Sequence, residues 1–569
     1  MGRGMFMTLL CSALAVVPAT PGAFGFAQGA GQEQDPTPSS SLLESLQAAG
    51  DLDPTFGNKG IKTTDFFGNY DAATSLALQA DGKIVLAGIA YHGSTVNTSD
   101  FALARYNTDG SLDTGFGVGG KQSLDFVGSY DQANGVAIQS DSKIVAVGAS
   151  GHSIPTSDFA LARYNPDGTL DQGFGSSGMQ TTDFFGNEDS AFGVVIQPDG
   201  KIVLAGYAHH GVDVTTSDFA MARYNSDGSL DQTFGSGGKV TTDFFGSDDV
   251  AYRIALQPDG KLVLAGLTFN PGTKSDDFAV ARYNPNGSLD SSFGAGGKQT
   301  TDFFGGLDYA AGVAIQQDGK VVLAGLAAHG SDVSTYDFAL LRYNQDGSLD
   351  QAFGAGGRQT TDFFGNADYA TGVAIQADGK IVVAGYASHG SSTGDLALAR
   401  YNLDGALDQS FGAGGLQTTN LLGNSDDNDT ARAVGIQQDG GIVVAGNTQR
   451  GLTQVADFAV ARYYAAPALP DFTIGFNSST VSAQAGSKVA LTVLVNRIGG
   501  FGGNVTITPP AASMGIKPKP PDPITTSSSS AVLKMKIGAG VAPGSYSRTF
   551  TATDDSGRTR TATVTIVVQ

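Results

Sequence analysis

The residues of this sequence that could do chemistry are histidines and aspartates that recur at regular spacing. The chain has 6 histidines, all in polar segments that differ between the copies of a repeat. Histidine is a common ligand of transition metals, but only one adjacent pair could chelate an ion locally, and no His-Glu-x-x-His spacing occurs. We therefore expect no metal or other cofactor and assign these residues to variable loops that contact a ligand: His92, His152, His209, His210, His329 and His389.

A second recurrent group is the aspartate of the segment Thr-Thr-Asp-Phe-Phe-Gly and its variants. If these aspartates point toward a central channel, they form an acidic ring at its mouth, where a cation could bind. If they begin a turn, they accept hydrogen bonds from the turn's amides. Both interpretations remain open for Asp65, Asp125, Asp183, Asp243, Asp302 and Asp362, with Asn420 in the last copy. A further row follows the same turns: Asp71, Asp131, Asp189, Asp249, Asp308 and Asp368.

The stretch "RYNTDGSLDTGFG" resembles a calcium-binding loop in composition. Aligned with an EF-hand, however, it has Arg105 at the first ligand position and Phe116 at the closing one, where a bidentate carboxylate is required. We therefore interpret it as a joint between strands, with Asn107 and Asp109 bonding their own backbone and Phe116 buried. Asp113 either caps a turn or faces an arginine. We expect Arg105 to pair with Asp100 in a bond between strands or between repeats.

Catalytic motifs are scarce in this chain. It has no cysteine other than Cys11 and no phosphate-binding loop. Paired carboxylates for glycoside hydrolysis are an alternative, although no copy of the repeat has an acid that its siblings lack. We expect a protein that is not an enzyme.

These residues are positioned by a repeat that returns every 58 to 62 residues. Each copy has four short runs that are typical of strands, in the first copy Ile61–Phe66, Ser75–Gln79, Lys83–Gly88 and Asp100–Asn107. Such a period, with no helical pattern, predicts an all-β, seven-bladed β-propeller of four-stranded blades. We place the first run innermost and expect the ring to close by packing, without a swapped strand. The signature Leu-Asp-x-x-Phe-Gly begins at Leu52, Leu112, Leu170, Leu230, Leu289, Leu349 and Leu407.

The repeat also resembles a known family. "RYNTDGSLDTGFG" followed by "QPDGKIVLAG" or its variants is similar to the delta-60 repeat of bacterial exported proteins, which is expected to form β-propellers. The resemblance covers residues 51 to about 464 and implies export and fold. It implies no activity and no functional residues.

The remaining segments differ in composition. Residues 1–27 have the apolar run and small residues of a signal peptide, and residues 28–50 read as a flexible lead. The repeats occupy 51–464 and a linker 465–470. Residues 471–569 have alternating runs typical of an immunoglobulin-like β-sandwich of about seven strands without a disulfide.

The net charge and the hydropathy of the chain disfavour several classes of partner. The net charge of −21 disfavours nucleic acid and anionic membranes, and no segment is long enough to insert into a bilayer. We therefore expect a secreted or cell-surface monomer that binds an extracellular protein or glycan through the variable loops. The alternatives are a propeller glycosidase or lyase acting on extracellular polysaccharide and a purely structural envelope protein.

Overall fold

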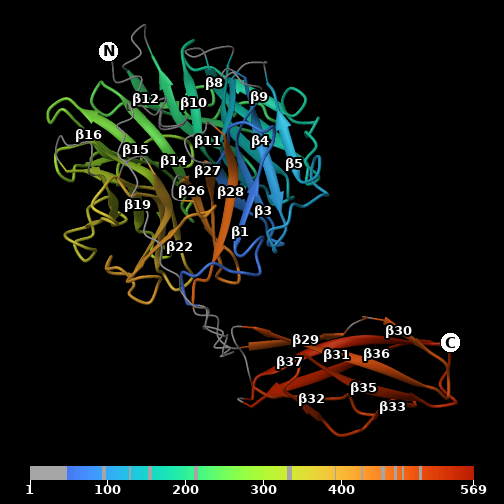
Figure 1. Cartoon of the computed structure of the whole chain (residues 1–569). Helices are drawn as coiled ribbons and strands as arrows, with labels where there is room; N and C mark the ends of the chain where they lie inside the picture. Colours follow the sequence, from blue (N-terminus) through green and yellow to red (C-terminus); the bar gives the residue numbers. More distant parts are fainter. Residues whose placement is uncertain are drawn as a thin grey trace, which may run out of the picture. The chain divides into compact units, whose positions relative to one another are not determined.

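The computed structural model of the chain is built from strands and turns. It describes residues 48–569 except for 93–97, 127–129, 152–156, 211–215, 330–335, 391–392, 425–426, 450–454, 467–470, 477, 479, 499–502 and 556. The described residues contain no helix, so the expected all-β class is confirmed. They fall into two compact units, which meet between Ala465 and Ala466 in the sequence (Figure 1). The predicted signal peptide and most of the lead lie outside the described residues.

The first unit is built from groups of four antiparallel strands, each with an axial, a second, a third and an edge strand. A single parallel bridge joins two neighbouring groups at two places, so that two of the sheets have eight strands. The axial strands are β2 (Asp71–Leu78), β6 (Tyr130–Ile138), β10 (Asp189–Ile196), β14 (Asp249–Leu256), β18 (Asp308–Ile315), β22 (Asp368–Ile375) and β26 (Asn428–Ile436). The second strands are β3 (Ile84–Tyr91), β7 (Ile144–Gly151), β11 (Ile202–His209), β15 (Leu262–Asn270), β19 (Val321–Ala328), β23 (Ile381–Ser388) and β27 (Ile442–Gln449). The third strands are β4 (Ser99–Tyr106), β8 (Ser157–Tyr164), β12 (Ser217–Tyr224), β16 (Ser275–Tyr283), β20 (Tyr336–Tyr343), β24 (Gly394–Tyr401) and β28 (Ala456–Tyr463). The edge strands are β5 (Lys121–Leu124), β9 (Met179–Thr182), β13 (Lys239–Thr242), β17 (Lys298–Thr301), β21 (Arg358–Thr361), β25 (Leu416–Thr419) and β1 (Ile61–Thr64).

The sequence of each strand matches its place in the sheet. The second strand β3 reads IVLAGIAY and is buried along its whole length, as a continuous apolar run predicts for a strand covered on both faces. The edge strand β5 reads KQSL and is only half-buried. The hairpin between axial and second strands turns at Asp-Gly, where Gly82 has a φ of 85° that favours glycine.

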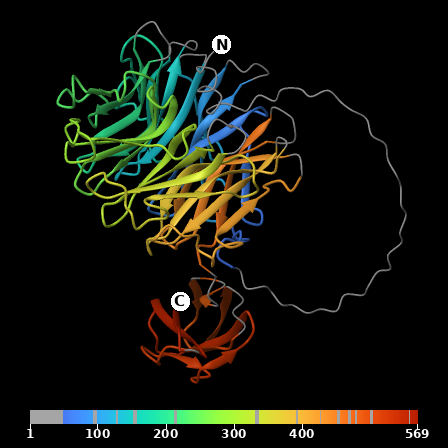
Figure 2. The same cartoon turned by 90° about the vertical axis from the view of Figure 1, so that its left-hand side faces the viewer.

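The axial strands contact one another in order along the chain, and β26 contacts β2. A core cluster joins Phe56, Ile84 and Tyr106 near one end of the chain to Val443 and Val460 near the other. In both views the orange strands near the end of the first unit, which include β26 to β28, lie beside the blue strands at its start, which include β1 (Figures 1 and 2). The first and last sheets therefore pack against each other as any two neighbours do.

Our expectation that the ring closes without a swapped strand is wrong. β1, at the start of the chain, pairs with β28 in the last sheet, from Ile61 opposite Ala461 to Thr64 opposite Phe458. The two ends of the chain thus share one sheet. The Leu-Asp signature marks the period of the repeat, but it does not mark where a sheet begins.

The placement of the first run innermost is wrong for the same reason. Ile61–Phe66 and its counterparts supply the edge strands, and each completes the sheet of the preceding third strand, as β5 does on β4. The innermost position belongs to the run that starts at Asp71. Short, half-buried strands with Lys, Gln and Thr suit an edge better than a core.

The second unit has two sheets that enclose one apolar core. β35 alternates buried and exposed residues, as expected when one face is packed and the other solvated. The described residues of this unit form nine strands instead of about seven, and four of them are only three or four residues long. They are β29 (Asp471–Phe476), β30 (Thr480–Ala483), β31 (Lys488–Ile498), β32 (Val505–Thr508), β33 (Ile516–Lys519), β34 (Ile524–Thr526), β35 (Ser530–Ile537), β36 (Gly544–Asp554) and β37 (Thr559–Val568). Among the described residues, no helix could span a membrane.

Candidate functional site

The joints after the third strands are structural. Arg105 Nε donates to Asp113 Oδ2 at 2.8 Å, Lys83 Nζ lies 2.9 Å from the same oxygen, and the guanidinium lies 4.7 Å from the centre of the Phe116 ring. The predicted pair of Arg105 with Asp100 is therefore wrong, because an eight-residue return of the chain brings Asp113 to the guanidinium first. Phe116 is fully buried, as predicted.

Hydrogen bonds occupy the acidic groups of this joint. Burial of Asp113 acts to raise the pKa, but hydrogen bonds from Lys83 and Gly115 and the charge of Arg105 hold it below its ordinary value. Asp109 Oδ1 accepts from the backbone N and the hydroxyl of Ser111 at 2.9 and 2.6 Å. The interpretation as a turn is confirmed at Asp109, whose oxygen bonds to the local backbone.

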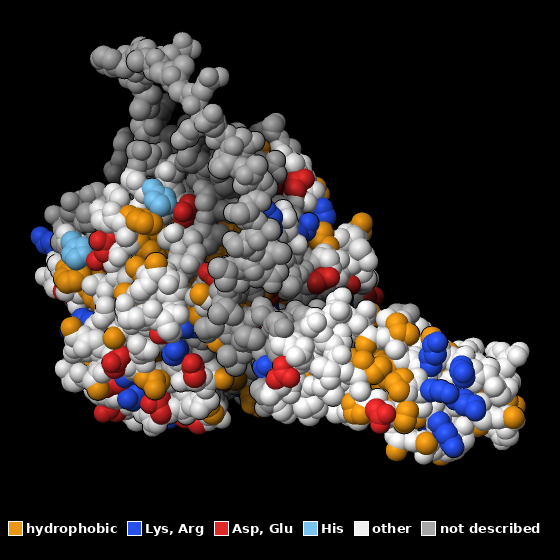
Figure 3. Space-filling view, turned by 60° about the horizontal axis from the view of Figure 1, so that its bottom comes forward, with side chains coloured by type: hydrophobic (Ala, Val, Ile, Leu, Met, Phe, Trp, Pro, Cys, Tyr) orange, Lys and Arg blue, Asp and Glu red, His pale blue; other side chains and the backbone are white. Residues whose placement is uncertain are grey.

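The opposite face of the unit carries the variable loops. His92 Nε2 lies 2.6 Å from Asp100 Oδ2, and its ring lies 3.9 Å from the ring of Phe67, which is 40% exposed. In Figure 3, histidine side chains lie beside hydrophobic and acidic ones. The same trio recurs as His210 with Asp218 and Phe185, His329 with Asp337 and Phe304, and His389 with Asp395 and Phe364.

The predicted histidines do not form one group. Four of them make this local contact, each on its own sheet, whereas His209 is buried against Tyr207, with 5.0 Å between the rings. His152 lies outside the described residues. The structure adds the exposed phenylalanine, whose signal was the second Phe of Phe-Phe-Gly in nearly every copy.

The aspartates of the Thr-Thr-Asp turns do not form an acidic ring at a channel mouth. Asp65 follows the edge strand β1, which β28 and β27 separate from the axial strand β26 of the same sheet, and its Oδ1 accepts a hydrogen bond from the Gly68 amide at 2.6 Å. The turn-capping alternative is the one that the structure shows. It recurs at Asp183, Asp243, Asp302, Asp362 and Asn420.

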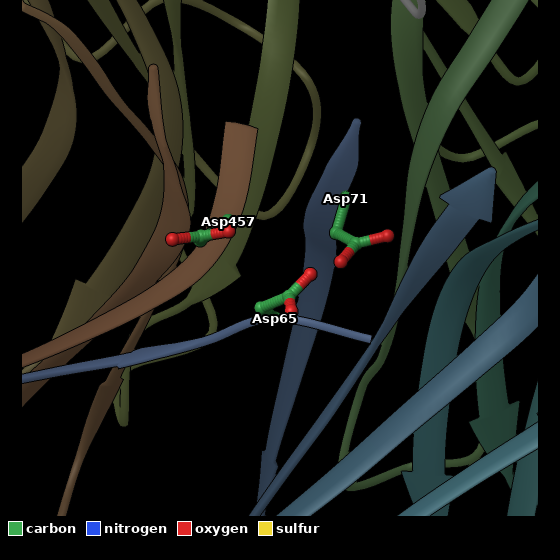
Figure 4. A group of neighbouring side chains, drawn as sticks. All are labelled: Asp65, Asp71 and Asp457. Atoms are coloured by element: carbon green, nitrogen blue, oxygen red, sulfur yellow. The ribbon is translucent and has the colours of Figure 1, made fainter. Parts of the chain in front are cut away.

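The second row of aspartates is buried at the starts of the axial strands. Asp71 Oδ2 accepts from the Phe66 amide at 2.6 Å, and burial raises the pKa of Asp71 to about 7. Figure 4 shows the carboxylates of Asp65, Asp71 and Asp457 side by side, contributed by a turn and two strands. Among the described residues, three groups of this kind have carboxylate oxygens within 4.8 Å of one another. Each of these groups consists of aspartates only. Burial first, and then the charges of the neighbouring carboxylates, raise the pKa of one buried member of each group, which is Asp71, Asp189 or Asp249.

A cavity of about 90 Å³ lies on the axis of the first unit. Each axial strand has a β-bulge, and the extra residue of every bulge lines this cavity. This cavity was not predicted from the sequence. The signal was an alanine present in every copy, followed by a residue that changes: Thr74, Asn134, Phe192, Tyr252, Ala311, Thr371 and Arg432.

Six stretches of the chain match a family described as "Domain of unknown function (DUF5122) beta-propeller", at residues 79–116, 139–174, 197–234, 257–293, 316–353 and 376–411. Each runs from the hairpin before a second strand to the phenylalanine of the following joint. The corresponding seventh stretch is divided between β27 and β28 at one end of the chain and Leu52–Phe56 at the other. The expected β-propeller repeat is confirmed.

No curated protein matches the chain. Among solved structures, domains 4 and 5 of the S-layer protein SbsC are 16% identical over 34% of this chain and 92% of that chain, with a TM-score of 0.13. A tetra-tandem repeat in the extending region of a large adhesion protein is 14% identical over 90% of this chain and 94% of that chain, with a TM-score of 0.12. Likeness this weak carries no argument about function.

Proposed function

We propose that this chain, which carries six recognisable DUF5122 β-propeller repeats, is an exported, non-catalytic binding protein. In this proposal the first unit is a closed seven-bladed propeller and the second an immunoglobulin-like sandwich. The ring of contacts among the axial strands and the pairing of β1 with β28 support the blade count. The apolar run near the start of the sequence supports export.

The observation that carries the proposal is a set of exposed phenylalanines at one equivalent position. A phenylalanine in a turn of a soluble protein is normally covered, and repeated exposed aromatic side chains mark surfaces that bind partners. These side chains lie on the face of the histidine loops, where the copies of the repeat differ most. They are Phe67, Phe185, Phe245, Phe304 and Phe364, between 40% and 47% exposed.

The chemistry of this face favours an extracellular protein or glycan partner. Flat aromatic rings at a regular spacing offer apolar contact area, and each of four carries a histidine and an aspartate that can hydrogen-bond beside it. The acidic net charge of −21 opposes nucleic acid.

The test removes together the four exposed rings that contact a histidine. A variant with Phe67, Phe185, Phe304 and Phe364 changed to Ser should lose binding to the cell envelope and to a glycan array by tenfold or more. The matched control changes Val118 and Leu403 to Ser, which are 82% and 56% exposed in the joints of the opposite face. Circular dichroism and a thermal melt establish that both variants fold. Unchanged binding by the folded phenylalanine variant would overturn the proposal.

A further inference from the structure

We infer that the axial cavity binds a small carboxylate that carries one ring, at a site separate from the exposed phenylalanines. The inference goes beyond the proposed surface contact. It rests on which residues the bulges place around the axis and on their charge.

The bulges are positions at which the side chain differs from one copy of the repeat to the next. In β10 the register shifts between Ala191 and Gly193, and Phe192 is the extra residue that faces the axis. Gly193 keeps the neighbouring strands close, because a Cβ there would lie 2.9 Å from Ile254 Cγ2. At the position after the bulge most copies have Gly, Ser or Ala, whereas the fourth has Arg253. Arg253 therefore places a long, charged side chain at a position where the neighbouring strands lie close together in other copies.

One side of the cavity is aromatic. The rings of Phe192 and Tyr252 have their centres 5.5 Å apart, and so do those of Tyr252 and Tyr309. Tyr369, on the next axial strand, also lines the cavity. These four side chains come from consecutive sheets, so they form a continuous arc that can pack against a flat ring.

The other side is polar, and its neutral groups already have partners. The hydroxyl of Thr74 donates to the carbonyl of Ala133 at 2.7 Å, and that of Thr371 to the carbonyl of Ala431 at 2.8 Å. The Asn134 amide donates to the carbonyl of Ala191 at 2.9 Å. These bonds join β2 to β6, β6 to β10 and β22 to β26, which is a structural role.

The charged residues of the lining are arginines. Arg253 and Arg432 line the cavity, and none of its described lining residues is acidic. Burial raises the pKa of Tyr369 and the charge of Arg432 opposes that rise, so the guanidinium lies close to the aromatic arc. In a chain with 54 acidic and 33 basic side chains, a cavity with two cations and no carboxylate favours an anion.

The size and shape of the cavity limit which ligands can bind there. An engineered apolar cavity of about 150 Å³ binds benzene, so a cavity of about 90 Å³ excludes ligands with more than one ring and encloses a one-ring ligand only in part. The ring would lie on the aromatic arc while its carboxylate accepts paired hydrogen bonds from a guanidinium. The bulges lie three or four residues from the starts of the axial strands, nearer the histidine face than the joints. An aromatic acid and a uronic acid share this chemistry.

The experiment is calorimetric titration of the folded mature chain with benzoate and with glucuronate, each beside its neutral counterpart, benzyl alcohol or glucose. We expect one carboxylate to bind at least tenfold more tightly than its neutral counterpart. Benzoate binding would identify an aromatic acid as the ligand class, and glucuronate binding a uronic acid.

The variants locate the site. R253Q/R432Q should weaken binding at least tenfold, whereas K59Q/K62Q, which removes the same charge at the edge strand β1, should bind as the parent does. Ala311→Phe fills the cavity without removing a charge, so it should also abolish binding. This variant tests the inference if the double variant fails to fold. The phenylalanine-to-serine variant of the outer face should bind the carboxylate normally.

Three results would overturn the inference. They are equal affinity for charged and neutral ligands, unchanged affinity in both cavity variants, and no binding of either carboxylate at millimolar concentration.

Discussion

The buried arginine of each joint holds neighbouring segments of the chain together. Arg223 is 6% exposed, and its guanidinium contacts Asp231 at 2.7 Å and also donates to Gln197. Lys201 lies 2.8 Å from the same carboxylate. Two cations thus share one acid, and the pKa of Asp231 lies well below its ordinary value because hydrogen bonds and charge outweigh burial.

Removing that acid should therefore destabilise the first unit. Asp231→Asn leaves a buried guanidinium without its counter-charge, and we expect a loss on the order of 2–3 kcal/mol in the free energy of unfolding. Urea unfolding of the variant and the parent measures the difference. Asp199→Asn is the control, since that side chain is 58% exposed and lies 4.0 Å from Lys201. Equal losses in the two variants would contradict the argument.

The edge strand β1 has only four residues, but it joins the start of the chain to the last sheet. Its four residues pair with β28, and the joint that precedes it supplies Asp53 to Arg462, a pair that forms within one repeat everywhere else. Ends of the chain about four hundred residues apart therefore complete one sheet and one joint. Without β1, the strand β28 would expose an unpaired edge.

A cross-link should capture this pairing. Because the Arg462 amide donates to the Gly60 carbonyl, the opposed residues Thr63 and Ala459 form a pair without mutual hydrogen bonds, with Cα atoms about 4.5 Å apart. Thr63→Cys with Ala459→Cys should form a disulfide that speeds the chain in non-reducing electrophoresis and raises the melting temperature. Thr63→Cys alone should do neither. Failure of the double variant to cross-link while it remains folded would mean that β1 does not close the ring.

Seven buried carboxyls at the starts of the axial strands give the whole first unit a common pH dependence. Burial is the largest cause at each, and it raises the pKa to about 6 at Asp131 and Asp429, about 7 at Asp71, Asp308 and Asp368, and about 8 at Asp189 and Asp249. Between pH 5 and 8 these seven carboxyls therefore bind more protons in the folded chain than in the unfolded chain. Stability must fall as pH rises through this window.

We expect the melting temperature to be highest near pH 5 and to decline toward pH 8. Asp189→Asn with Asp249→Asn removes the two most perturbed acids, so the decline should become shallower and the variant should be more stable than the parent at pH 8. Asp199→Asn with Asp259→Asn, in exposed hairpin turns, should leave the slope unchanged. A melting temperature that rises from pH 5 to 8 would contradict the buried-acid account.

Local interactions could be predicted from the sequence. Strand runs, Asp-Gly hairpins, the buried Phe116 and the bonds of Asp109 to its own turn all depend on residues a few positions apart, so spacing alone determines them. The period of the repeat likewise follows from its copies. Together they were enough to predict an all-β repeat protein.

Only the tertiary structure decided the features that depend on distant partners. In a cyclic repeat, the period of the sequence does not show where one sheet ends and the next begins. Hydrogen bonds between distant segments decide which strand is innermost and place β1 in the last sheet. Asp113 rather than Asp100 meets Arg105 because the loop returns, which residue types do not reveal. The axial cavity depends on bulges in every sheet at once, and one residue from each copy meets the others only after the ring forms.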